Sequence, residues 1–213
     1  MNSLVEIPLT SFVVALSGAL APGPLMITAV REASHSRSTK PGLWLSLGHA
    51  SAEAPVTAIL MYGLLSIDKG LFPFLSLLGG VFLVATGLLT FIKPGRESVR
   101  LGKTAGTRGF LTLVALGATV SISNPYWTTW WVTIGAAYVS KALTVGGIGV
   151  LLFYLSHEMG DLVVLSLVSK TVASSTGSIG EKGFKILIGL CNFAIIMIGM
   201  YFILDGAWSL ASG

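Results

Sequence analysis

The chain has 213 residues, of which 53% are hydrophobic and only 10% are charged, whereas charged residues make up about 25% of an ordinary soluble domain. A water-soluble fold could not bury this excess of apolar side chains. The net charge of +4 comes from basic residues that are spread over short segments, which argues against a nucleic-acid-binding domain. Cys191 is the only cysteine, so the chain cannot form an internal disulfide framework or a dithiol relay.

Six long apolar segments predict an all-α integral membrane protein with six transmembrane helices, because each is near or above the roughly 20 residues that a spanning helix needs. In chain order they cover residues 8–30, 43–65, 71–92, 109–139, 144–168 and 184–204. Helices are favoured over barrel strands because the segments are continuously apolar and do not alternate with a period of two. No Lys or Arg precedes the first segment and no small-residue cleavage site is evident, so we expect a permanent helix and not a removable signal peptide.

The basic residues between these segments predict the orientation of the chain. Eleven of them follow the first, third and fifth segments: Arg31, Arg37, Lys40, Lys93, Arg96, Arg100, Lys103, Arg108, Lys170, Lys182 and Lys185. The opposite side has only Lys69 and Lys141. By the positive-inside rule, the side with eleven basic residues is cytoplasmic, and both termini face outside.

Two parts of the chain resemble each other. Residues 47–53 and 155–161 read LGHASAE and LSHEMGD, so each has Leu, a small residue, His and then a carboxylate four residues after the His. Each part also follows a helix-breaking element about one span earlier, at residues 22–24 (PGP) and 124–125 (NP). This order predicts an internal repeat.

Because each copy contains three spans, the second copy enters the membrane from the opposite side. We therefore expect two inverted-topology units, at residues 1–92 and 109–213, joined by a basic cytoplasmic loop at 93–108. Such repeats with interrupted helices are typical of secondary transporters, in which two halves move around a central site. The alternative is that the prolines and glycines only kink their helices. The candidate substrate-binding residues lie at and after the breaks: Pro22, Gly23, Pro24, Asn124, Pro125, Tyr126 and Trp127.

Ionisable residues inside the predicted helices are the candidates for proton coupling. A charged group near the bilayer centre costs about 2.5–3.5 kcal/mol on insertion scales, so it needs a partner or a function. His49 and Glu53 share a helix face, as do His157 and Asp161, because each pair is four residues apart. Glu158 lies next to the second pair. We expect these five residues to carry protons or to bind an ammonium group.

Three alternatives for these residues remain open. Each His could simply neutralise its neighbour and join helices. The His and carboxylate side chains could bind Zn²⁺ or a divalent substrate. Residues 157–161 are also one residue away from the HExxH motif of metalloproteases, with Asp205 as a distant third ligand, although the second His is missing. We expect no cofactor and no resident metal. The sequence has no nucleotide-binding loop, so an ion gradient must supply the energy for transport.

Aromatic residues form two groups. One group lies near predicted helix ends, where an interfacial belt explains it: Trp44, Tyr138 and Trp208. The other group follows the second break: Trp127, Trp130 and Trp131. One or more of the second group could line a substrate cavity, and packing against lipid is an equal alternative for Trp130 and Trp131.

At these residues the chain resembles the LysE-type translocator family, which are small bacterial and archaeal exporters of amino acids and related solutes. The matching elements are residues 21–24 (APGP), residues 124–125 (NP) and residues 160–161 (GD), together with six spans in a chain of this length. Glu53 stands where the family often has Asp, and Tyr126 stands where it often has Lys. The missing lysine leaves the charge preference for substrate open.

The resemblance implies an exporter in the cytoplasmic membrane of a prokaryote and not an enzyme. We therefore predict a secondary transporter that exports an amino acid or a similar small zwitterion in exchange for protons. Its partners would be the substrate, protons and lipid but no nucleic acid, with a homo-oligomer as an open option. Divalent-cation export is the alternative within transport, and an intramembrane metalloprotease is the alternative from another class.

Overall fold

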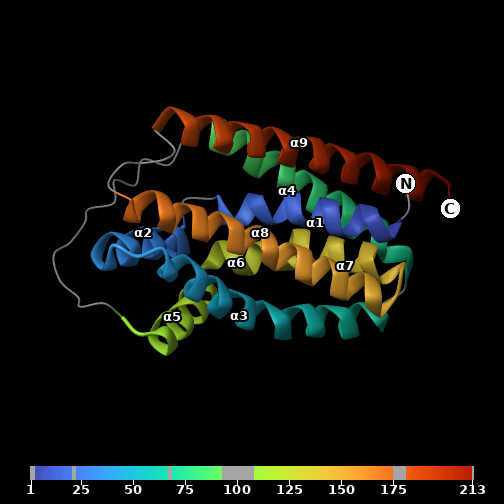
Figure 1. Cartoon of the computed structure of the whole chain (residues 1–213). Coiled ribbons are helices and arrows are strands. Elements are labelled where there is room, and N and C mark those ends of the chain that lie inside the picture. Colours follow the sequence, from blue (N-terminus) through green and yellow to red (C-terminus); the bar gives the residue numbers. More distant parts are fainter. Residues whose placement is uncertain (1–2, 21–22, 67–68, 93–107, 175–180, 213) are drawn as a thin grey trace.

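The computed structural model describes residues 3–20, 23–66, 69–92, 108–174 and 181–212, and these residues form helices and short connections without any strand (Figure 1). The elements are α1 (Ser3–Ala19), α2 (Pro24–Ser36), α3 (Lys40–Leu65), the 3₁₀ turn η1 (Lys69–Leu71), α4 (Phe72–Ile92), α5 (Phe110–Ile122), α6 (Pro125–Trp130), the π-helical turn η2 (Trp131–Gly135), α7 (Ala136–Leu143), α8 (Gly147–Ala173) and α9 (Glu181–Ser212). The predicted all-α class is confirmed.

Two of the six predicted helices are broken where the sequence indicated. The first segment is divided into α1 and α2, which are inclined by 76°. The fourth is divided into α5, α6, η2 and α7. Pro24 and Pro125 are each the first residue of a helix, where the missing N–H costs no hydrogen bond. Pro22 lies outside the described residues.

At the second break, the side chain of Asn124 caps the N-terminus of α6. The Asn124 side-chain oxygen accepts a hydrogen bond from the Tyr126 backbone N–H at 3.0 Å, which satisfies one of the free donors at the start of α6. At the first break, Gly23 is extended and provides no such cap. Only the second of these two helix starts therefore has a side-chain cap.

The packing of the helices brings the two halves of the chain together. α3 packs against both α5 and α8, α1 packs against α8, and α4 packs against α9. Glycine allows two of these crossings: a Cβ at Gly48 would overlap the backbone of Val114 on α5, and a Cβ at Gly160 would meet Ala15 and the Phe12 carbonyl on α1. These close crossings position the His residues of α3 and α8 in the centre of the bundle.

Tyr138 is a correction to the predicted interfacial belt. It is only 1% exposed, and its ring stacks on Phe153 and lies against Phe202. The reason is that the fourth segment continues to Leu143, so Tyr138 lies more than a turn inside the helix end. Trp208, by contrast, is 75% exposed near the end of α9.

The outer surface is apolar, as expected of a bundle surrounded by lipid. Leu111 and Ile59 are 76% and 69% exposed. Among the described residues, α8 alone is long and apolar enough to cross a membrane, and α1 with α2 passes the same test as one bent unit. The first turn of α1 and the last turn of α9 lie at the same end of the bundle (Figure 1).

Candidate functional site

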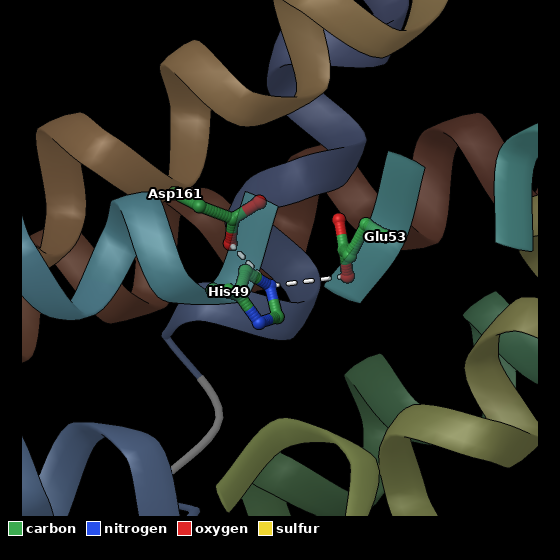
Figure 2. A group of neighbouring side chains, drawn as sticks. All are labelled: His49, Glu53 and Asp161. Carbon is green, nitrogen blue, oxygen red and sulfur yellow. Dashed lines mark ion pairs between the residues drawn. The ribbon is translucent and has the colours of Figure 1, made fainter. Parts of the chain in front are cut away.

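Two histidines and two carboxylates from α3 and α8 meet in the interior. His49 Nε2 lies 3.1 Å from Glu53 Oε1 and 3.9 Å from Asp161 Oδ1. His157 Nε2 lies 3.3 Å from Glu53 Oε2 and 3.4 Å from Asp161 Oδ2. Each carboxylate thus faces both imidazoles, and Figure 2 shows His49 between Glu53 and Asp161. We call these four residues the His/carboxylate core; all of them are buried.

Ser121 on α5 orients His49. The Ser121 hydroxyl donates its single hydrogen to the Gly117 carbonyl at 2.7 Å. Its oxygen must therefore accept from His49 Nδ1, which is 2.7 Å away. Nδ1 then carries a hydrogen, and Nε2 is directed at the two carboxylates. Since a bare nitrogen lone pair would repel ionised carboxylate oxygens, this arrangement requires either a proton, on Nε2 or on one of the facing carboxyl groups, or a positive group in its place.

His157 has no comparable partner for its other nitrogen. Its Nδ1 is buried and makes no hydrogen bond with a described residue. Its ring packs instead among aromatic rings, with the Trp130 centroid at 4.7 Å and the Phe153 centroid at 5.7 Å. The two histidines are therefore inequivalent, although the sequence places them in matching positions.

Three tryptophans enclose the core from the second break. The indole N–H groups of Trp127 and Trp131 both donate to Glu53 Oε1, at 2.7 and 2.9 Å. Trp130 donates to the Ser17 hydroxyl on α1 at 3.1 Å. Trp130 and Trp131 are 3% and 2% exposed, so the alternative that they face lipid is wrong. Trp131 also opens the π-helical turn, a feature that often occurs at functional sites.

A small cavity of about 60 Å³ lies beside the core, and all four core residues line it. Ala19 and Leu25, on either side of the first break, form part of its wall. Asn124, Tyr126 and Trp127, at the second break, form another part. The two breaks therefore meet at one cavity.

The chain matches one known protein family over most of its length. Residues 16–206 match the family described as LysE type translocator. The chain belongs to this family. A protein of Bacillus subtilis (strain 168) with the name "Putative amino acid efflux protein YcgF" is 26% identical over 205 residues, which cover 93% of this chain and 95% of the relative. No solved structure matches the chain.

Membership of the LysE type translocator family confirms the resemblance seen in the sequence and identifies a membrane transporter, not an enzyme. The metalloprotease alternative is therefore wrong. The structure gives a physical reason as well, because Asp205 is exposed near the end of α9, whereas His157 is buried in the core.

Not every predicted site residue lies at the cavity of this LysE-type translocator. Gly23, which precedes α2, and Pro24, its first residue, are not among the described residues that line the cavity. Pro125 begins α6, and its side chain lies outside the description. Glu158 is half-buried, with its carboxyl group near that of Glu53.

Two residues of the site were not predicted. Ser121 and Ser17 both bond site side chains, yet serine is common in membrane helices, and neither lies in a motif. The position of Ser121 one turn before the Asn124 break was a usable signal, since this placement brings it beside the same cavity.

Ion pairs connect the first and fourth segments at both ends of the bundle. Lys141 on α7 pairs with Glu6 on α1 at 2.5 Å and donates to the Tyr201 hydroxyl at 2.9 Å. Arg108, just before α5, pairs with Glu32 on α2 at 3.0 Å. In each pair the first segment supplies the carboxylate and the fourth supplies the cation.

Proposed function

We propose that this protein is a secondary active transporter that exports an amino acid or a similar small zwitterion in exchange for protons. One observation carries the proposal: the buried His/carboxylate core needs a shared proton or another cation, and it lies beside a cavity at which two interrupted helices meet. The family of translocators and the name of the Bacillus subtilis relative support the same class of substrate.

The exchange follows from the charge balance of the core. Glu53 and Asp161 face His49 Nε2, and the place between them suits one cation. A proton on the imidazole fills it in one state. The ammonium group of a substrate fills it in the other, after the proton has left. Because both cations would use the same carboxylates, binding of one displaces the other, which is the requirement for antiport.

The opposite end of the substrate would be bound at the helix breaks. Groups beside the breaks at residues 23–24 and 124–125, together with Tyr126 and Trp127, would hold the carboxylate and the side chain once the site opens, since the Asn124 N–H and C=O are here bonded to Ser121 and Thr128. Tyr126 can donate a hydrogen bond but carries no charge, so it favours a neutral substrate over an acidic one. A cavity of about 60 Å³ holds only a few waters, so the site must widen to admit an amino acid.

Movement of two inverted-topology units against each other, residues 1–92 and 109–213, would widen the site. The packing of α1 on α8 has its counterpart in the packing of α5 on α3. Two further contacts, of α3 with α8 and of α4 with α9, each join helices that occupy the same place in the two units. These symmetric pairs support a twofold axis in the membrane plane. The proposal includes six crossings, both termini outside and residues 93–108 in the cytoplasm, in the cytoplasmic membrane of a prokaryote.

Purified protein in liposomes tests the proposal. The liposomes are loaded with a panel of amino acids, and efflux is measured with and without an inward proton gradient. We expect amino-acid efflux that the gradient accelerates in the wild type and in the control variant His35→Gln, whose exposed side chain lies at the end of α2. Absence of gradient-dependent efflux for every amino acid would contradict the proposal.

Divalent-cation export is the second candidate. His49, Glu53 and Asp161 offer three ligand atoms that lie within 4.8 Å of one another, a set that a divalent cation can use (Figure 2). Liposomes loaded with Zn²⁺ or Mn²⁺ distinguish the candidates, because metal efflux without amino-acid efflux would favour the cation.

A further inference from the structure

An open groove at the end of the bundle near the start of α3 is separate from the core and its cavity. It lies between the first turns of α3 and the last turns of α8 and has a volume of about 450 Å³. Its lining consists of Thr39, Lys40, Leu43, Leu162, Ser166 and Lys170. Two cations, two hydroxyl groups and two leucines thus come from two helices that are distant in sequence.

We infer that this groove binds the headgroup of an anionic phospholipid. Lys40 and Lys170 are exposed and form no ion pair with a described residue, so their charges are available to a ligand. Thr39 and Ser166 add hydroxyl donors, which suit phosphate oxygens. Leu43 and Leu162 give the groove an apolar wall, against which the beginning of an acyl chain can lie. A soluble anion would leave that wall without a partner.

The N-terminus of α3 reinforces this charge pattern, while Lys170 offsets the partial negative charge at the C-terminal end of α8. The N-terminus of α3, which carries partial positive charge, opens at the groove. Thr39 makes no side-chain capping hydrogen bond. The Lys40 N–H donates to the Ser38 hydroxyl at 3.2 Å, and Pro41 has no N–H, so the Gly42 and Leu43 N–H groups are the first-turn donors left for a ligand. An anionic oxygen is the natural partner for such a helix end. Lys170 lies in the last turn of α8, so both ends meet at the same level of the bundle.

The position of the groove along the bundle agrees with the level of lipid headgroups. It belongs to the end of the bundle at which most basic residues are expected, and the positive-inside rule puts that end at the leaflet with anionic lipids. Each lysine near such a surface contributes about a fivefold gain in affinity, so the pair would contribute about 25-fold. This inference does not depend on which solute the protein exports.

Lipid binding to the delipidated full-length protein tests the inference. Binding of phosphatidylglycerol and phosphatidylcholine is measured by native mass spectrometry in detergent and by thermal unfolding in nanodiscs of each lipid. We expect preferential binding of phosphatidylglycerol and a higher unfolding temperature in its presence. Lys40→Gln and Lys170→Gln should each weaken the preference about fivefold. Arg31→Gln, which removes an exposed charge outside the groove, should leave it unchanged.

Three results would overturn the inference. One is equal binding of the two lipids by the wild type. Another is an undiminished preference in the variant that lacks both lysines while its unfolding temperature in phosphatidylcholine matches the wild type. The third is stabilisation by inorganic phosphate alone that equals that of phosphatidylglycerol, because the ligand would then be a free anion. A misfolded variant is recognised in phosphatidylcholine nanodiscs, and the single-lysine variants then decide.

Discussion

The hydrogen bond from Trp127 to Glu53 provides a direct measure of the charge in the core. The indole N–H of Trp127 lies 2.7 Å from Glu53 Oε1, which also accepts from Trp131 at 2.9 Å. A hydrogen bond to a charged group contributes about 1.5–3 kcal/mol, and a neutral one about 0.5–1.5 kcal/mol. Trp127→Phe should therefore lower the free energy of unfolding by about 1.5–3 kcal/mol in the wild type, but by only about 0.5–1.5 kcal/mol in a Glu53→Gln background.

The difference is a coupling energy of about 1–1.5 kcal/mol between the two positions. Unfolding of the four proteins of this double-mutant cycle is measured in mixed micelles with increasing denaturing detergent. Trp208→Phe is the matched control, because this tryptophan is 75% exposed near the end of α9 and should show no coupling to Glu53→Gln. Additive effects of Trp127→Phe and Glu53→Gln would refute an ionised Glu53 held by the indole.

Four further predictions concern other parts of the chain. Asp161→Asn should still insert and should bind substrate more weakly, through Glu53 and the amide oxygen, but should lose acceleration of efflux by an inward proton gradient; wild-type acceleration in liposomes would remove Asp161 from the coupling. Gly48→Ala should cost about 1–3 kcal/mol of unfolding free energy, since its Cβ would overlap the α5 backbone; an unchanged unfolding transition would show that α3 and α5 are further apart. Lys141→Met should cost about 1 kcal/mol through loss of the Glu6 ion pair, and a loss that persists at high salt would contradict an electrostatic cause. A cysteine at Gly102 in a Cys191→Ser background should be protected in intact cells from an impermeant reagent added outside, and labelling would reverse the proposed orientation.

Local sequence signals predicted the helices and their breaks because both depend on short-range physics. Continuous apolar runs mark the helices, and proline marks the first residue of α2 and of α6. The pairing of His49 with Glu53 was equally local, since a spacing of four puts both on one face. These features need no knowledge of how the helices pack.

Contacts between helices could not be predicted in the same way. The approach of His157 to Glu53 depends on how closely α3 and α8 cross, which is set by glycines and small residues on neighbouring helices. The burial of Trp131 likewise depends on a π-helical turn that has no simple sequence signal. Tyr138 was misplaced because hydropathy ended its helix four residues too early.

The ion pairs at the two ends of the bundle differ from the core in their exposure to salt. Arg108 is 38% exposed in its pair with Glu32, and Lys141 and Glu6 are 21% and 20% exposed. At physiological ionic strength, charges at such surfaces are screened over about 8 Å, while buried charges are screened much less. A rise in ionic strength therefore weakens the ion pairs at the two ends of the bundle and has little effect on the buried His/carboxylate core. In a cell that adjusts its internal salt to osmotic stress, the stability of the Arg108–Glu32 pair, on the proposed cytoplasmic side, would follow the water balance of the cytoplasm, whereas the Lys141–Glu6 pair would respond to the salt outside.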